Sequence, residues 1–368
     1  MIYFDSAATT LQKPKAVAEA VALAIGTMTT PGRGDHPASK LAADKMLALR
    51  MLAADMFDVS APDNVILTMN ATHGLNIAIN ALVSPGDTVV ISGYEHNAVS
   101  RPLHGIPDVE VRVVNSRLFD QDQIAEGFEK AIDGKVRAVI CTHVSNVFGY
   151  VLPIDDIAQI CRKKGVPLIV DASQSAGILP VKLRAWDAAY VVMPGHKGLY
   201  GPQGTGLLLC GDGYIPDPLM KGGTGSLSRL QDMPDFLPDR LEAGTQNIHG
   251  AAGLLEGMKF VNGFVSGRIA HYEGRLMRML AEGLKDRGEF RVFSPSTDTS
   301  VVSIVPLHMT PEELADRLAE QGVATRAGLH CAPLAHISAG TDKIGTIRFS
   351  ASVFNTEAEV DHLLGLLC

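Results

Sequence analysis

One lysine stands in a glycine-rich stretch, MPGHKGLYGPQGTG (193–206), directly after an apolar run. A P-loop that grips nucleotide phosphates needs Ser or Thr immediately after its lysine, followed by a helix. Lys197 is followed by glycine instead, and the residues beyond it are typical of a turn and a strand. The pattern therefore argues against nucleotide hydrolysis. It leaves a lysine that either bonds covalently to a ligand or faces water.

Asp171 ends the apolar run VPLIVD, and this position favours the covalent role for the lysine. A carboxylate at the end of a buried strand carries a large desolvation penalty unless a cation pairs with it. The protonated pyridine nitrogen of pyridoxal 5'-phosphate (PLP) is such a cation, and PLP enzymes bind the cofactor through a Schiff-base lysine. Lys197 is the candidate for that bond if it shares a crevice with Asp171.

Alternating strand and helix patterns from residue 64 onward predict the sheet that would bring these side chains together. The alternation is typical of a mostly parallel sheet with helices on both faces. Ligands of such sheets bind outside the carboxyl ends of the strands. The polar residues that follow the apolar runs are Asn70, Thr72, His96, Ser145, Asn146, Asp171, Gln174, His196 and Lys197.

The length of 368 residues and a change of pattern after about residue 250 indicate two domains. Residues 39–57 predict a helix with Ser39 as its N-cap. Residues 216–238 are rich in Gly, Pro and Ser and predict long loops. Beyond residue 250, helical segments alternate with the short strands VVSIV and TIRFS, which is typical of a smaller α+β unit.

Composition and charge exclude several classes of protein. The net charge is -8 and no basic run occurs, which argues against a surface for nucleic acid or anionic membranes. No signal-peptide pattern and no membrane-length apolar run is present, so we expect a cytoplasmic protein. The cysteines are odd in number and form no CxxC pair, which fits a reducing compartment. They are Cys141, Cys161, Cys210, Cys331 and Cys368.

Seven segments, in order over nearly the whole chain, resemble those of cysteine desulfurases. That family belongs to the class V aminotransferase group of fold-type I PLP enzymes, which also includes selenocysteine lyases. The segment RAGLHCA resembles the branch in which the catalytic cysteine follows a histidine. The seven segments are YFDSAATT (3–10), EHNA (95–98), HVSNVFG (143–149), VDASQ (170–174), GHKGLYGPQGTG (195–206), EAGTQN (242–247) and RAGLHCA (326–332).

The resemblance implies an α/β fold of type I. A large PLP-binding domain, residues 16–255, would contain a mostly parallel seven-stranded sheet flanked by helices. A smaller α+β domain would combine residues 1–15 with residues 256–368.

The resemblance also implies how the cofactor is held. Lys197 would bind PLP covalently, Asp171 would pair with its pyridine nitrogen, Gln174 would contact its phenolic oxygen, and His96 would stack on its ring. The phosphate would be bound by the loop at Ala71 and Thr72, by His196, and by Thr245 of a second subunit, which implies a homodimer.

Two departures from the family pattern remove hydroxyl groups from the phosphate site. Many relatives have serine directly before the GHK motif, where this chain has Pro194, and paired threonines where it has Ala71 and Thr72. Backbone N–H groups at the start of the helix predicted at 72–82 can compensate. The departures put the affinity for the cofactor in question, and leave the fold unaffected.

For the reaction, the resemblance implies that Asn146, Arg348 and Arg326 bind the carboxylate of L-cysteine. Cys331 would attack the substrate sulfur and carry it as a persulfide, leaving L-alanine, and a protein acceptor would then take the sulfur. His96 would handle the proton of the substrate thiol. His330 either changes the pKa of the Cys331 thiol or has a side chain that points elsewhere.

Other interpretations remain open from the sequence. A selenocysteine lyase, an aminotransferase or a racemase-like enzyme would share the PLP motifs, and a scaffold for sulfur-carrier proteins would need none of the chemistry. His330, Cys331 and His336 also suggest a metal site, but zinc requires a fourth ligand that no motif supplies, so we expect no metal.

Overall fold

The structure of the chain is a computed structural model. It describes residues 1–367 apart from 33, 266, 286 and 295–298. Cys368, one of the five cysteines, lies outside the described residues.

The largest of the three sheets has seven strands, as expected, in the order β2-β8-β7-β6-β5-β3-β4. The five strands from β7 to β4 run parallel, and β8 runs antiparallel to both of its neighbours. The strands are β2 (Val65–Thr68), β3 (Thr88–Ser92), β4 (Glu110–Val114), β5 (Val136–Thr142), β6 (Leu168–Asp171), β7 (Tyr190–Pro194) and β8 (Gly206–Cys210).

Both faces of this sheet are buried, which explains why its central strands are apolar without a break. Along β3, Val89 and Ile91 join the apolar core on one face, whereas Val90 joins the core on the other. The helices before residue 263, with one 3-10 turn, are α1 (Lys15–Thr27), α2 (Pro37–Met56), η1 (Pro62–Asn64), α3 (Ala71–Leu82), α4 (Asn97–Gly105), α5 (Gln121–Ala131), α6 (Ile154–Lys164), α7 (Leu183–Trp186) and α8 (Ile248–Asn262).

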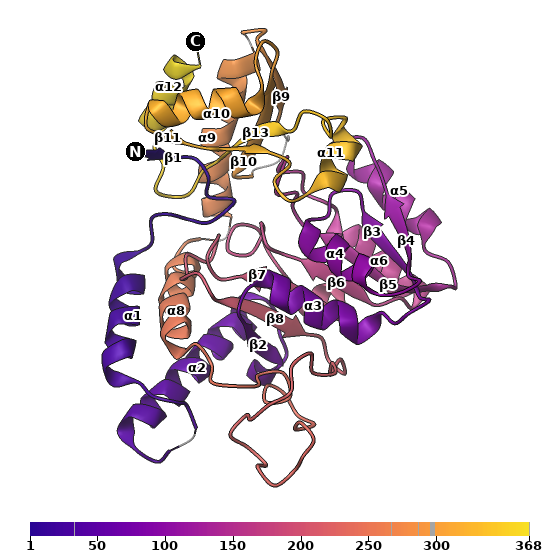
Figure 1. Cartoon of the computed structure of the whole chain (residues 1–368), viewed down its shortest axis with the longest axis vertical. Helices are drawn as coiled ribbons and strands as arrows, with labels where there is room; N and C mark the ends of the chain where they lie inside the picture. Colours follow the sequence, from indigo (N-terminus) through magenta and orange to yellow (C-terminus); the bar gives the residue numbers. More distant parts are fainter. Residues whose placement is uncertain (33, 266, 286, 295–298, 368) are drawn as a thin grey trace.

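A second sheet, in the order β12-β13-β10-β9, is antiparallel and forms the upper part of Figure 1 with α9, α10 and α12. The start of the chain joins this part, because β1 pairs with β11 and Asp5 bridges to Ser350. The elements are β1 (Ile2–Tyr3), α9 (Arg268–Lys285), β9 (Phe290–Phe293), β10 (Val301–Pro306), α10 (Pro311–Glu320), β11 (Val323–Ala324), β12 (Arg326–Gly328), α11 (Pro333–Ala339), β13 (Thr346–Ser350) and α12 (Glu357–Leu366).

The start of α2 corrects one prediction. The helix begins at Pro37, and His36 is its N-cap because its Nδ1 accepts the Ser39 N–H at 3.3 Å. Ser39 lies inside the first turn, where its hydroxyl donates to the Thr30 carbonyl. Proline has its φ fixed for the first helical position and lacks the N–H that would go unpaired there. The predicted N-cap at Ser39 was therefore wrong by three residues.

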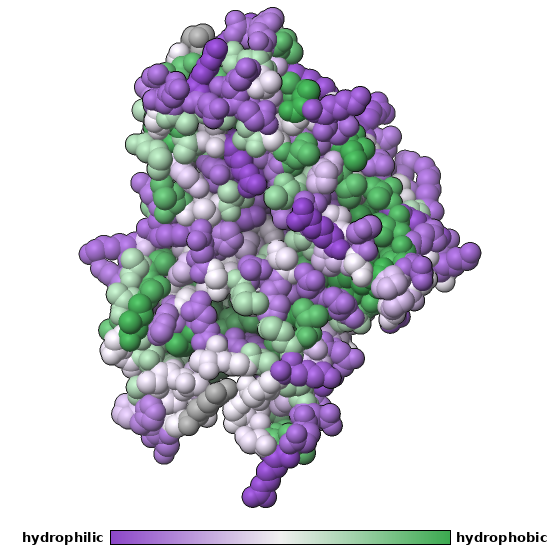
Figure 2. Space-filling view, viewed as in Figure 1, coloured by the Kyte–Doolittle hydropathy of each residue, from purple (hydrophilic) through white to green (hydrophobic). Residues whose placement is uncertain are grey.

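The carboxyl ends of the parallel strands face the gap between the lower and upper parts of the molecule in Figure 1. Figure 2 shows polar residues gathered in a recess there. Residues 216–238 contain neither helix nor strand, as expected. Among the helices that the structure describes, none combines the length and the apolar character needed to span a bilayer.

Candidate active site

Asp171 is the last residue of β6, and its side chain is only 3% exposed. Its Oδ1 accepts the Ser173 N–H at 2.9 Å, and it forms no salt bridge with any described residue. Gln174 follows on the same turn, with its side-chain nitrogen donating to the Ala7 carbonyl at 3.0 Å. A buried carboxylate without an ion pair is suited to a cationic ligand atom.

Lys197 follows β7 and is partly buried. The pKa of its amine is lowered to about 8, chiefly by burial and also by the charges of Arg348 and Arg326, while Asp171 opposes the shift. A substantial fraction of this amine is uncharged near neutral pH, which a lysine needs in order to act as a nucleophile.

His96 caps α4, with its Nδ1 accepting the Ala98 N–H at 3.0 Å. The ring proton therefore resides on Nε2. Burial lowers the pKa of His96 to about 4, and Asp171 and Lys197 are near enough to act on it in opposite directions. The structure thus brings these three predicted residues into one electrostatic neighbourhood, with a neutral imidazole beside the acid and the amine.

Glu95 is a buried acid that the sequence reasoning missed. Its Oε1 accepts the Thr142 N–H at 2.8 Å and the hydroxyl of Ser92. Thr142 lies opposite Asp171 in the register of β5 and β6, so Glu95 supports the strand end that carries Asp171. Burial raises the pKa of Glu95 to about 8. The quoted EHNA motif contained this residue, but nothing in it distinguished Glu95 from a solvated acid.

The first turn of α3 contains Ala71 and Thr72, as predicted to within one residue. Asn70 is the N-cap, and its Oδ1 accepts the His73 N–H at 2.9 Å. Thr72 is exposed, so its hydroxyl and the N–H groups of this turn are available to an anion.

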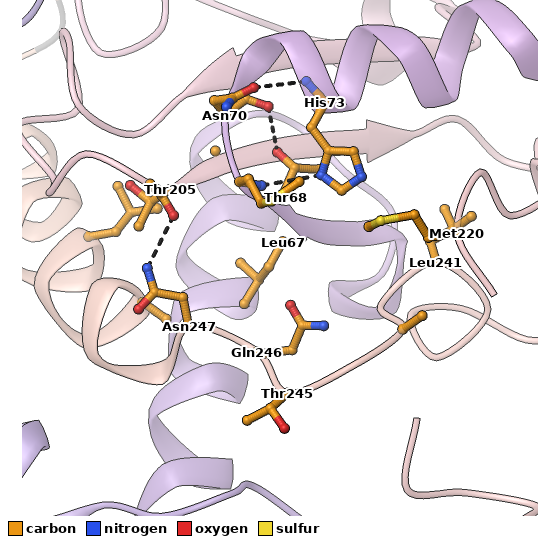
Figure 3. A pocket seen from close by; sticks show the side chains of 16 residues that line it. Leu67, Thr68, Asn70, His73, Thr205, Met220, Leu241, Thr245, Gln246 and Asn247 are labelled. Carbon is orange, nitrogen blue, oxygen red and sulfur yellow. Dashed lines mark hydrogen bonds between the residues drawn. The ribbon is translucent and has the colours of Figure 1, made fainter. Parts of the chain in front are cut away.

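Thr245 is exposed and lines a cavity of about 440 Å³ beside α3. Figure 3 shows Asn70 and His73 at one side of this cavity and Thr245 at the other, with Gln246 between them. Lys197 does not line it. Within one chain, Thr245 therefore shares a cavity with Asn70, the N-cap of α3, and not with Lys197.

Arg348 is 1% exposed, and two partners fix its guanidinium. Nη2 pairs with Asp5 Oδ1 at 2.6 Å, and Nη1 donates to the Asn146 carbonyl at 2.9 Å. The side-chain nitrogen of Asn146 donates to the His330 carbonyl at 2.8 Å. Asp5 was missed from the sequence because only the fold brings it to Arg348. Arg326 is more accessible, and its Nη2 lies 3.7 Å from the Cys331 sulfur.

Cys331 is exposed on a tight turn between β12 and α11. His330 and Cys331 both have left-handed backbones, with φ of 50° and 57°. The Cys331 carbonyl accepts the Asn97 N–H at 2.7 Å, which ties the turn to the start of α4. A non-glycine residue in this conformation persists when its surroundings hold it, and such residues concentrate at functional sites.

The His330 ring contacts Thr346. Its Nε2 lies 3.1 Å from both the carbonyl and the hydroxyl oxygen of Thr346, and burial lowers its pKa to about 2. His336 stacks on His330 with ring centroids 5.9 Å apart, and its Nδ1 lies 2.8 Å from the Thr341 hydroxyl. Among the described residues, no three possible ligands gather to hold a metal ion.

These residues fit PLP. Asp171 offers a buried carboxylate that forms no salt bridge with a described residue, and Lys197 offers an amine with a lowered pKa. The start of α3 offers a helix N-terminus and the exposed Thr72 for a phosphate.

Comparisons with known proteins agree with this fit. The family model "Aminotransferase class-V" matches residues 2–363. A "Probable cysteine desulfurase" of Pyrococcus abyssi is 30% identical over 388 residues, covering 100% of this chain and 93% of that protein. A "Probable cysteine desulfurase" of Mycolicibacterium paratuberculosis is 29% identical, and the chain spans 54% of its length.

Among solved structures, the apo structure of a cysteine desulfurase from Thermococcus onnurineus NA1 is similar to the chain, with a TM-score of 0.90. The two are 29% identical, and the match covers 100% of this chain and 93% of the other. Enzymes of this class depend on PLP. By sequence and by fold, the chain belongs to the class V aminotransferase family and, within it, to the cysteine desulfurases.

Proposed function

We propose that the protein converts L-cysteine to L-alanine and retains the sulfur as a persulfide on Cys331. One substrate sulfur joins the Cys331 sulfur while its bond to the substrate Cβ breaks, so L-cysteine and the thiol give L-alanine and Cys331–S–SH. The persulfide sulfur then passes to an acceptor protein.

The placement of Cys331 carries this proposal. Its exposed sulfur lies 3.7 Å from Arg326, whose charge acts on both His96 and Lys197. Aminotransferase or racemase chemistry would require the lysine and Asp171 but no thiol beside them. The matched relatives carry the name cysteine desulfurase, which favours the same choice.

PLP, when bound, supplies an electron sink for charge that develops on the substrate carbon. Asp171 would hold the pyridine nitrogen through the carboxylate oxygen that Ser173 does not occupy. Gln174 would hold the phenolic oxygen and His96 would cover the ring. The first turn of α3 with Thr72, and His196, would bind the phosphate.

The remaining roles belong to side chains around the substrate. Arg326, with Arg348 and Asn146, would bind its carboxylate, and Arg326 is the most accessible of the three. The Lys197 amine would remove the Cα proton. His96 would donate a hydrogen bond through Nε2 to the substrate sulfur, which keeps its own proton as the Cys331 thiolate attacks it. The substrate Cβ, which receives the electrons of the broken C–S bond, would then take a proton to become the methyl group of alanine.

The proposal also covers the oligomeric state, the domain division and the location of the protein. We propose a homodimer in which Thr245 reaches the phosphate of the partner's cofactor, as the resemblance to cysteine desulfurases implies, and within one chain Thr245 lines a cavity that Lys197 does not line. We also propose two domains, with a large domain that ends after α8, because residue 255 falls inside that helix. The pairing of β1 with β11 supports grouping residues 1–15 with the smaller domain. We retain a cytoplasmic location on the basis of the scattered free cysteines.

An assay of alanine and sulfide released from L-cysteine tests the reaction. Cys331→Ser should lose at least about 100-fold in this activity, because serine is a poor nucleophile toward sulfur, while it keeps the visible absorbance of covalently bound PLP. Lys197→Ala should lose that absorbance as well as the activity. Cys161→Ala, which removes a buried thiol from α6, serves as the matched control and should remain active.

Two outcomes would contradict the proposal. Full sulfide release by Cys331→Ser would show that the Cys331 thiol takes no part in the reaction. Transamination of L-cysteine or selenide release from L-selenocysteine, with no turnover of L-cysteine to alanine, would assign a different reaction to the same site.

A further inference from the structure

The amino-terminal segment surrounds the carbonyl oxygen of His196, the peptide oxygen directly before Lys197. Four donors lie within hydrogen-bond distance of this oxygen. They are the Thr9 hydroxyl at 3.2 Å, the Thr10 hydroxyl at 3.1 Å, the Thr10 N–H at 3.1 Å and the Lys13 ammonium at 3.0 Å.

A carbonyl oxygen has two lone pairs, so these four donors exceed its capacity. The Thr10 N–H has no other acceptor among the described residues, and the charged Lys13 forms the shortest of the four bonds. The Thr9 hydroxyl, in contrast, has a nearer acceptor, because it lies 3.0 Å from Nδ1 of His196. The single hydroxyl proton of Thr9 can therefore be donated to Nδ1 of the His196 ring.

We propose that Thr9 donates its hydroxyl proton to Nδ1 of His196 and so fixes the ring in the tautomer with its proton on Nε2. Within the described part of the chain, Nε2 has no hydrogen-bond partner. A neutral imidazole has one N–H to donate, so the nitrogen that holds it decides whether the ring can bind an anion through Nε2.

The surroundings keep the ring neutral. Burial lowers the pKa of His196 to about 4, and the charges of Lys197 and Lys13 add to the effect. His196 therefore binds phosphate as a neutral donor whose direction Thr9 sets. This role rests on the proposed function, in which His196 contacts the phosphate of PLP. It gains weight because Ala71 and Pro194, next to the proposed phosphate site, have no hydroxyl group to offer.

Thr9 is a positioning residue in this scheme, and two variants separate its hydroxyl from its shape. Thr9→Val keeps the shape and removes the hydroxyl, whereas Thr9→Ser keeps the hydroxyl. The dissociation constant of PLP from the apo-protein should rise about tenfold in Thr9→Val, because one charge-directed hydrogen bond is lost, and stay at the wild-type value in Thr9→Ser.

A second measurement reads the tautomer directly and does not depend on the folding of a Thr9 variant. In the wild-type apo-protein with ¹⁵N-labelled histidine rings, NMR should show the His196 proton on Nε2, with His196→Gln identifying the signal. A proton on Nδ1, or unchanged PLP affinity in Thr9→Val, would overturn the inference. If wild-type protein fails to bind PLP, the proposed function fails instead, and the NMR result still tests the tautomer.

Discussion

Single residues at the site have altered acid–base behaviour because the fold buries them beside specific charges. Lys197 is the clearest case, since burial lowers its pKa to about 8 while Asp171 opposes the shift. Its uncharged form, the one that would attack the aldehyde of PLP in the proposed function, becomes more abundant as the pH rises through that value.

The rate of covalent PLP attachment to the apo-protein should therefore increase about tenfold between pH 7 and pH 9 and then level off. Stopped-flow absorbance at several pH values measures this rate, with Lys197→Ala as the blank. A rate that stays constant over this range, or falls, would show that the free amine does not limit attachment.

The residues named from the sequence were those next to a recognisable pattern. Lys197 followed from its glycine-rich loop and Asp171 from its strand end. Asp5 and Lys13 were missed because their partners are 343 and 183 positions away, and no pattern in one sequence pairs such residues. Glu95 was missed for a different reason, because a sequence does not show whether an acid is buried.

At the scale of elements, a buried polar contact joins the loop after Lys197 to the smaller part of the molecule. The Tyr200 hydroxyl donates to Glu273 of α9 at 3.2 Å and accepts the Val353 N–H at 3.0 Å. Burial raises the pKa of Glu273 to about 8, so this acid is largely protonated at neutral pH. The loop that carries the lysine is thus held by an uncharged acid.

This contact predicts a pH-dependent stability. Glu273 has a higher pKa in the folded chain than in the unfolded one, so its contribution is fully present below about pH 4.5 and is lost as the pH rises through about 8. Glu273→Gln should remove part of that loss, and the variant should gain a few kcal/mol in free energy of unfolding relative to wild type between pH 5 and pH 8.

Denaturant unfolding of the apo-proteins at pH 5, 6.5 and 8 measures the difference. Glu282→Gln, on the exposed side of the same helix, is the matched control and should parallel wild type. Glu95 is present in all three proteins, so its own raised pKa cancels from the comparison. Parallel curves for Glu273→Gln and wild type would contradict the assignment.

The types of the elements were well predicted because the spacing of apolar residues shows which side chains are buried. The strands of the sheet and the helices that cover it both depend on such burial. The strands at β2, β3, β5, β6 and β7 all lie where apolar runs were found. The start of α2 was predicted wrongly, because a serine in the first turn resembles an N-cap when the proline before it is not considered.

At the scale of the whole molecule, the proposed dimer can be tested by mixing two variant proteins. In a heterodimer of Lys197→Ala and Thr245→Ala chains, one site would combine an intact Lys197 with the Thr245 of its partner. If Thr245 acts across the interface, the mixture should recover one wild-type-like site in each heterodimer. If it acts within its own chain, no such site forms.

PLP affinity measured on purified heterodimers, alongside each homodimer, distinguishes these outcomes. Analytical ultracentrifugation gives the oligomeric state independently, and a monomeric wild-type protein would contradict the dimer outright. The sequence suggested this arrangement only through family resemblance, because contacts between chains leave no periodic pattern in either one.

The ion pair between Asp5 and Arg348 has a consequence for biosynthesis. Asp5 is made 343 positions before Arg348. The proposed site for the substrate carboxylate therefore stays unfinished while the chain between them emerges, and long-range closure of this kind slows folding. In the proposed reaction, a nascent chain could not bind L-cysteine before β13 is in place, so turnover would be confined to chains in which both partners have come together.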